Sequence, residues 1–284
     1  MGNLEPSHSG FSEHNKVKIY YEYYGDKDRP AILLMNGVAM EASSWQQFIP
    51  ALLERYDVLI WDYRGQGKST SDDKPYSITE YADYLKSIID TLQLEPRFVN
   101  PVGVSFGSFV ATEFIRKYPE SVNKAILSGA ILTDELTYHY QSQLARKILT
   151  LNQMEIWVDS LYTQLFSSEF LKRIEPYIPR MKEALFERYK DRKKALWNLL
   201  EAEDSYIKQT TELAAEYANT QVPILLIAGE YDMLTPPFVQ KKICSLFPNV
   251  SYKEIPACGH LTFMEKAREF LDLMADFLQV DKKS

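Results

Sequence analysis

A serine between two glycines is the first feature of this sequence that could carry out chemistry. Ser105 lies in the stretch VGVSFGS, with Gly103 two residues before it and Gly107 two residues after it, in a chain with only 11 glycines among 284 residues. A serine hydroxyl is a weak nucleophile at neutral pH. An enzyme that uses it must expose it, place a base beside it and stabilise the oxyanion that its attack creates. A tight strand-to-helix turn meets the first need, and glycine is favoured where backbone crowds such a turn.

The segments on either side of Ser105 predict the strand and the helix that this turn requires. Residues 98–103 form a short apolar run, and residues 108–120 carry apolar side chains on one face of a helix that ends at Pro119. Pro101 lies inside the predicted strand and has no N–H to donate. The strand should therefore be bulged, or paired on one side only, at that residue.

The same alternation of strands and helices runs through most of the chain. Strands are predicted at residues 18–25, 30–37, 56–65, 98–103, 123–130, 222–230 and 251–256, and helices at 43–56, 77–94, 108–120, 237–247 and 261–278. This order predicts an α/β fold with a mostly parallel, doubly wound sheet and helices on its faces.

A long insertion interrupts this alternation after the predicted strand at 123–130. About 90 residues separate that strand from the next one, far more than a connection between them needs. Residues 133–220 contain no glycine and many Leu, Glu, Lys and aromatic residues at helical spacing. We therefore predict a core domain formed by residues 1–132 and 221–284, and an inserted helical cap, or lid, formed by residues 133–220.

The cap should cover Ser105, because it follows the carboxyl end of a strand and open α/β sheets bind their ligands at those ends. Most of its aromatic side chains should pack between helices, and some should face the serine and enclose an apolar pocket. The aromatic residues considered are Trp157, Tyr162, Phe166, Phe170 and Trp197.

These motifs resemble the α/β-hydrolase superfamily, and the resemblance covers nearly the whole chain. It implies a catalytic triad in the chain order Ser, acid, His. The segment LLIAGEYDMLTP then supplies Asp232 just past a strand end, and IPACGHLTF supplies His260 before the last helix. In these roles His260 takes the proton of Ser105 and returns it to the leaving group. Asp232 fixes the imidazole tautomer and stabilises its charged form.

The resemblance also implies two backbone donors for an oxyanion hole. One is the N–H of Phe106, at the start of the helix that follows the serine. The other is the N–H of Val38 in the loop MNGVAM, where Asn36 and Gly37 stand in place of the His-Gly that is usual in the family. An asparagine can still hydrogen-bond to neighbouring backbone, so the loop geometry should survive this substitution.

Two assignments in this site stay open at the level of sequence. Asp134 follows the predicted strand at 123–130 and is an alternative to Asp232 as the triad acid, because some family members supply the acid from that position. Three other histidines could compete with His260. They are His8 and His14, in an N-terminal segment that we expect to be mobile, and His139 in the cap.

Composition excludes several classes of function. The net charge of −7 is spread over charges of both signs, which gives no footprint for nucleic acid or an anionic membrane. No apolar run approaches membrane-spanning length and no secretory signal is recognisable, so we expect a cytoplasmic protein. Cys244 and Cys258 cannot form a disulfide framework, and the four histidines lack paired metal-ligand spacing. No metal or other cofactor is expected.

The sequence therefore predicts a serine hydrolase that acts on an ester, thioester or lactone of a mainly apolar small molecule. One alternative is an acyltransferase, because LLMNGVAMEASSW resembles the corresponding loop of 3-hydroxyacyl acyltransferases of this fold. An acyl carrier protein would be a partner only in that case. Another alternative is a non-catalytic ligand receptor on the same fold. The sequence does not indicate an oligomeric state.

Overall fold

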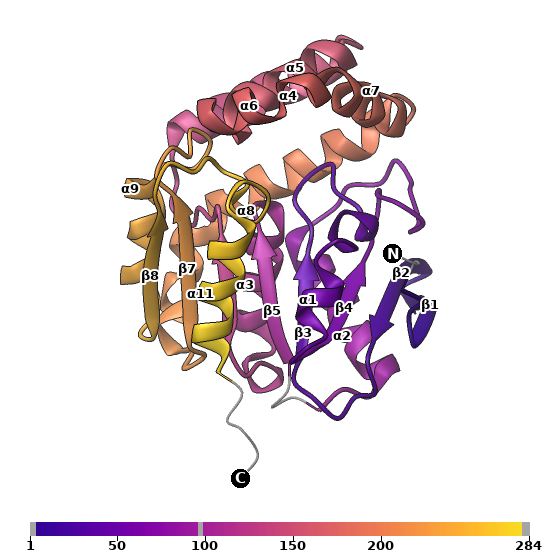
Figure 1. The fold of residues 1–284 in the computed structure, drawn as a ribbon, viewed down its shortest axis with the longest axis vertical. Coiled ribbons are helices and arrows are strands. Elements are labelled where there is room, and N and C mark those ends of the chain that lie inside the picture. Colours follow the sequence, from indigo (N-terminus) through magenta and orange to yellow (C-terminus); the bar gives the residue numbers. More distant parts are fainter. Residues whose placement is uncertain (1–3, 96–98, 280–284) are drawn as a thin grey trace.

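The computed structural model describes residues 4–95 and 99–279. One sheet of eight strands runs through this part of the chain in the order β1-β2-β4-β3-β5-β6-β7-β8 (Figure 1). The strands from β4 to β8 in this order pair in parallel, and β1 and β2 are antiparallel. The predicted fold class, a mostly parallel sheet between helices with an inserted helical cap, is confirmed. The strands are β1 (His8–His14), β2 (Val17–Tyr24), β3 (Ala31–Met35), β4 (Asp57–Trp61), β5 (Val99–Val104), β6 (Ala125–Ser128), β7 (Ile224–Gly229) and β8 (Val250–Ile255).

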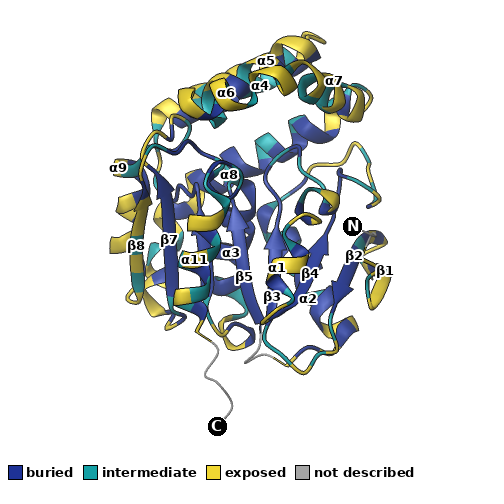
Figure 2. Cartoon of the chain, viewed as in Figure 1, coloured by how far each residue is buried: buried dark blue, intermediate teal, exposed yellow. Residues whose placement is uncertain are grey.

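Helices cover both faces of the sheet, because its central strands are apolar on both sides. Every residue of β3, β4, β5, β6 and β7 is buried (Figure 2). Helices α2 and α3 share one apolar core with the sheet, and α1, α10 and α11 share the other. The bounds are α1 (Ile49–Leu52), α2 (Ile78–Leu92), α3 (Phe106–Lys117), α9 (Pro237–Gln240), α10 (Thr262–Glu265) and α11 (Ala267–Leu278).

The segment that carries His8 and His14 forms strand β1, so the expectation that these two residues lie in a mobile segment is wrong. Residues His8–His14 pair with β2 along their full length. The turn between the two strands is made by Asn15 and Lys16, with φ angles of 52° and 66°. Consecutive positive φ angles are what a two-residue hairpin requires, and a sequence without Asn-Gly there gives little sign of it.

Three of the predicted helices are shorter in the structure than predicted, or are broken into two pieces. Residues 43–56 form only a 3₁₀ turn, Ala42–Trp45, and the short helix α1. Pro50 has no N–H to donate to the carbonyl of Gln46, so one continuous helix cannot pass through it. Residues 237–247 split into α9 and the 3₁₀ turn Lys241–Ser245, and 261–278 split into α10 and α11.

Pro101 is paired with β3 but not with β6. Its Cα partner on β3 is Leu33, whereas the pairing of β5 with β6 begins at Val102. This is the one-sided pairing expected of a proline inside a strand.

Five α-helices lie between β6 and β7 in sequence and above the carboxyl ends of the strands (Figure 1). The long helix α8 packs on the sheet side against α3 and on the other side against α4. A separate apolar cluster around Trp157, Tyr189 and Leu196 joins the cap helices to one another. The cap helices are α4 (Leu136–Thr150), α5 (Met154–Leu165), α6 (Ser168–Ile174), α7 (Ile178–Tyr189) and α8 (Lys193–Asn219).

The predicted division into a core and a cap at residues 133–220 stays a prediction. Residues 1–3, 96–98 and 280–284 of that core lie outside the described residues. Within residues 4–95 and 99–279, no helix has the length and apolar character needed to cross a membrane.

Candidate active site

Ser105 forms the turn between β5 and α3. Its backbone angles, φ 52° and ψ −121°, are uncommon for a residue with a side chain and present that side chain at the top of the sheet. The two flanking glycines permit this turn. A Cβ on Gly103 would lie 2.4 Å from the carbonyl oxygen of Gly107, and a Cβ on Gly107 would lie 2.4 Å from that of Met35. The spacing seen in the sequence therefore reflects close backbone contacts around Ser105.

The structure brings Asp232 and His260 together. Nδ1 of His260 lies 2.8 Å from Oδ2 of Asp232, and both side chains are fully buried. Asp232 follows the end of β7, and His260 lies in the loop before α10. A carboxylate can only accept, so Nδ1 donates its proton and Nε2 holds a free lone pair.

Two further side chains hold the carboxylate of Asp232, and sequence reasoning missed both. The hydroxyl of Thr235 donates to Oδ2 at 2.8 Å, and the amide of Gln240 donates to the same atom at 3.1 Å. Backbone N–H groups of Leu234 and Thr235 donate to Oδ1 at 3.0 and 2.8 Å. This short local loop around an aspartate is typical of an Asx turn, which is the signal that could have pointed to Thr235.

Ser105 and His260 both border the carboxyl end of β6. The backbone N–H of Ser105 donates to the carbonyl of Ser128 at 2.8 Å, and a Cβ on the next residue, Gly129, would lie 2.6 Å from Cε1 of His260. No hydrogen bond joins the serine hydroxyl to the imidazole within the described part of the chain. Nε2 of His260 is buried and unpaired there. Catalytic hydrogen bonds often form only when substrate is bound.

The loop of residues 36–40 is held by Asn36, which is buried. Its side-chain amide donates to the carbonyl of Trp61 at 2.8 Å, and its oxygen accepts from the indole of Trp45 at 2.7 Å. A Cβ on Gly37 would lie 3.5 Å from Cβ of Ser105, so this loop borders the serine. Val38 follows, and with Gly37 and Ser105 it lines one cavity. The asparagine therefore makes the backbone contact expected of it.

The alternative acid, Asp134, lies elsewhere. It is mostly exposed and pairs with Nε2 of His139, whose Nδ1 pairs with Asp204 of α8. These contacts raise the pKa of His139, although partial burial opposes them. The structure thus joins Asp134 to the cap histidine, and Asp232 to His260.

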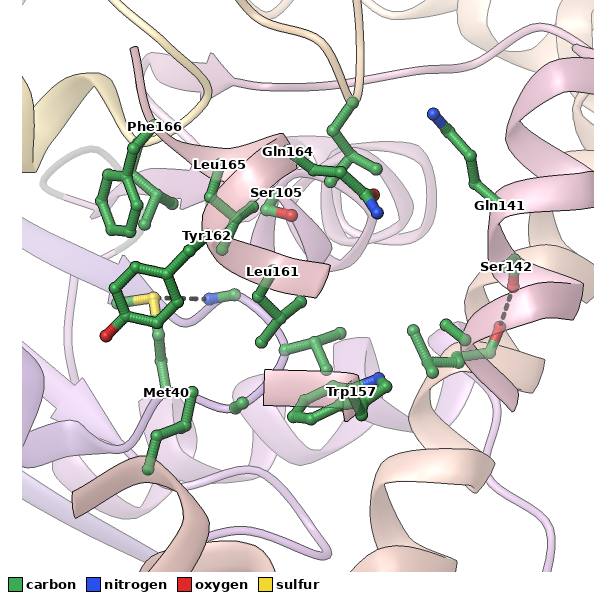
Figure 3. A pocket seen from close by; sticks show the side chains of 18 of the residues that line it. Met40, Ser105, Gln141, Ser142, Trp157, Leu161, Tyr162, Gln164, Leu165 and Phe166 are labelled. Carbon is green, nitrogen blue, oxygen red and sulfur yellow. Dashed lines mark hydrogen bonds between the residues drawn. The ribbon is translucent and has the colours of Figure 1, made fainter. Parts of the chain in front are cut away.

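A cavity of about 350 Å³ lies between Ser105 and the cap (Figure 3). Most of its walls are apolar, and they include three of the aromatic residues considered from the sequence, Trp157, Tyr162 and Phe166. Phe170 and Trp197 are not among the lining residues. Ser105 stands on the core side of this cavity, so a bound molecule would be enclosed between the sheet and the cap helices.

The loop that carries His260 is tied to the cap. The backbone N–H of His260 donates to the carbonyl of Leu165, the last residue of α5, at 2.9 Å. The buried carboxylate of Glu265 accepts from the N–H and the hydroxyl of Ser167 at 3.0 and 2.6 Å. The position of the imidazole therefore depends on contacts with the cap as well as on Asp232.

No cluster of three or more histidine, cysteine or acidic side chains suited to a metal ion occurs among residues 4–95 and 99–279. Cys258 is buried and Cys244 is exposed, and both are free.

Comparison with known proteins assigns the chain to a family. A model of the α/β hydrolase fold family matches residues 30–267. The pyrrolizixenacetamide deacetylase of Xenorhabdus hominickii is 23% identical over 276 residues, which cover 93% of this chain and 97% of that protein. The 3-oxoadipate enol-lactonase 2 of Acinetobacter baylyi is 22% identical over 256 residues, covering 89% and 90%.

Solved structures show the same fold. MGS-M2, an α/β hydrolase enzyme from a Medee basin deep-sea metagenome library, has a TM-score of 0.87 at 23% identity and covers 97% of this chain and 99% of its own. The enol-lactonase from Burkholderia xenovorans has a TM-score of 0.81 at 20% identity, with coverage of 95% and 100%. Since the family model spans most of the chain, this protein belongs to the α/β-hydrolase fold family.

Proposed function

We propose that this protein is a serine hydrolase that cleaves an ester, thioester or lactone bond of a mainly apolar small molecule through an acyl-serine intermediate. The observation that carries the proposal is the free Nε2 of His260, an imidazole oriented by Asp232 and placed with Ser105 at the end of β6. The cavity above Ser105 gives an apolar acyl group a place to bind.

Acylation uses these groups in order. Nε2 of His260 takes the hydroxyl proton as Oγ of Ser105 attacks the carbonyl carbon. The carbonyl oxygen becomes an oxyanion that accepts hydrogen bonds from the N–H groups of Val38 and Phe106. The bond to the leaving alcohol or thiol then breaks, and the imidazolium returns the proton to that group. Asp232 stabilises the positive ring while it exists.

Deacylation repeats these steps with water. His260 takes a proton from water, whose oxygen attacks the acyl carbon and forms a second oxyanion at the same donors. The bond to Oγ of Ser105 breaks, and the serine recovers its proton from the imidazolium. The products are a carboxylic acid and the free enzyme.

The relatives support an acyl-cleaving reaction without naming the substrate. A deacetylase and an enol-lactonase are among them, and both names denote the cleavage of an acyl bond to a heteroatom. The family fold alone hosts many chemistries, so the assignment to a serine hydrolase rests on the site.

Turnover of p-nitrophenyl butyrate tests this proposal. The wild-type protein should release nitrophenol and one equivalent of free butyric acid, and Ser105→Ala should lose this activity with its fold retained. The same assay with added methanol or a thiol separates hydrolysis from transfer. Acceptor-dependent products with little free acid would show that the protein is an acyltransferase instead, and no Ser105-dependent turnover would contradict both readings.

A further inference from the structure

One wall of the cavity contains a buried carboxyl group, and the proposed mechanism does not use this group. Glu203 of α8 is 3% exposed and is the one carboxylate among the described residues that line the cavity. Burial raises its pKa to about 7, although a hydrogen bond with Tyr138 and the charge of a protonated His260 act in the opposite direction. No basic side chain in the described ranges forms an ion pair with it. A carboxyl group in such a place is costly unless something binds it.

Further polar groups stand beside it on the neighbouring helix. Tyr138, Gln141 and Ser142 occupy positions i, i+3 and i+4 of α4, so they share one face, and α4 packs against α8. The hydroxyl of Ser142 is already used, because it donates to the carbonyl of Leu200 at 3.5 Å. The side-chain oxygen of Gln141 is buried and has no partner among the described residues.

These residues give the cavity one polar wall opposite its aromatic one. Figure 3 shows Gln141 and Ser142 on one helix at one side of the pocket, with Tyr162 and Phe166 at the other side and Ser105 between them. The polar wall carries one acceptor without a partner among the described residues, Oε1 of Gln141, and also the buried carboxyl group of Glu203, which is hydrogen-bonded to Tyr138. A buried acceptor that the protein leaves unfilled favours a ligand with a donor.

We propose that Glu203 and Gln141 bind a hydroxyl group of the substrate and so determine specificity within the cavity. This inference rests on the proposed function, because the same cavity must hold the scissile bond against Ser105. In this role Glu203 selects the substrate, and the proton transfers stay with His260 as in the proposed function.

A hydroxyl group fits this wall better than a charged group does. It can donate its one hydrogen to Gln141 or to an ionised Glu203, and while it donates to Gln141 it can accept from Glu203 in its protonated form. A substrate carboxylate would place a second negative charge beside Glu203. A substrate ammonium would be stabilised by Glu203 only when that carboxyl group is ionised, which burial disfavours, and it would share the cavity lining with the positive charge of Arg188.

Paired substrates test the proposal. One series compares p-nitrophenyl hexanoate with its 3-hydroxy and 6-hydroxy analogues, and a second compares propyl butyrate with 2-hydroxyethyl butyrate. We expect wild-type kcat/KM to favour the hydroxylated member by about 10- to 100-fold in at least one pair. Glu203→Leu should bring that ratio close to one, and Glu203→Gln should retain part of it. The control Glu212→Gln, at an exposed position of the same helix, should leave the ratio unchanged.

A binding measurement keeps the test independent of catalysis. Calorimetry with Ser105→Ala and with Ser105→Ala/Glu203→Leu measures the affinity for the same intact esters. About 10-fold tighter binding of the hydroxylated ester, lost in the double variant, supports the proposal even if no ester is hydrolysed, in which case only the proposed function fails. Equal affinities, no binding of either ester, or a stronger preference for a 6-amino analogue overturns the proposal. Ser105-dependent hydrolysis without a hydroxyl preference overturns this inference alone.

Discussion

Nδ1 of His260 lies 2.8 Å from Oδ2 of Asp232, which is 28 residues earlier in the chain, and neither side chain is exposed. Burial strengthens this interaction, because no water competes for the carboxylate. The pairing fixes one tautomer of the imidazole and leaves Nε2 as the atom that can accept a proton. The remaining contacts of Asp232 restrict how its carboxylate can rotate.

Substitution of Asp232 tests which acid orients His260. Asp232→Asn should lower kcat by roughly 10³- to 10⁴-fold, because an amide can donate to Nδ1 and stabilise the wrong tautomer. The matched control is Asp134→Asn, which removes a carboxylate that pairs with His139. Its activity in an ester assay should stay within about twofold of wild type. A larger loss in Asp134→Asn than in Asp232→Asn would show that the acid is misassigned.

Thr235 should act as a positioning residue for the carboxylate. Its hydroxyl donates to Oδ2 of Asp232 and also lies 3.2 Å from Nδ1 of His260. Thr235→Val removes the donor at nearly constant volume, so kcat should fall about 10-fold with little change in KM. Thr235→Ser keeps the hydroxyl and should restore most of the rate. Equal activity of the valine and serine variants would contradict a role for this hydrogen bond.

The contact between Glu265 and Ser167 should stabilise the joint between the cap and the histidine loop. Glu265→Ala leaves both donors of Ser167 unpaired in a buried place, and should cost about 3 kcal/mol of unfolding free energy. Ser167→Ala removes one donor and should cost about 1 kcal/mol. Urea unfolding followed by circular dichroism measures both values. A greater loss of unfolding free energy in Ser167→Ala than in Glu265→Ala would contradict this prediction.

The raised pKa of Glu203 should make the free energy of unfolding depend on pH. Its pKa is raised by burial from 4.5 to about 7 in the folded protein, so the folded state holds this proton more tightly than the unfolded state does. Stability therefore falls as pH rises from about 4.5 to about 7. Glu203→Gln removes that loss, so the variant should gain up to about 3 kcal/mol relative to wild type across this window. Urea titrations at pH 5 and pH 7.5 measure the difference, and a constant offset between the two proteins would contradict it.

Local patterns in the sequence were enough to predict the strands from β2 to β8 and the turn at Ser105. The glycines at 103 and 107 carry information because backbone atoms lie where their side chains would be. The predicted helix at 43–56 and the strand β1 show the limit of such patterns. Helical spacing alone missed the break at Pro50, although a proline in the sequence marks such a break. The hairpin at Asn15 and Lys16 depends on pairing with β2, which no local pattern encodes.

Local sequence patterns did not indicate two polar residues near the site, Gln240 and Glu203. Gln240 lies in the short helix α9, eight residues after Asp232, and no sequence motif indicates that its amide donates to that carboxylate. Glu203 belongs to a long helix rich in charged residues, where an acid is normally solvated. Its burial follows from the way α8 passes between the sheet and α4, and this packing is set by contacts between segments far apart in sequence.

Covalent labelling most directly tests whether Ser105 is an activated nucleophile. The wild-type protein is incubated with a fluorophosphonate probe, and peptide mass spectrometry locates the adduct, with Ser105→Ala treated in parallel. Our account predicts one adduct on Ser105 of the wild-type protein, slower labelling in His260→Ala, and none in Ser105→Ala. An unlabelled Ser105 in the folded wild-type protein, or an adduct that persists in Ser105→Ala, would contradict it.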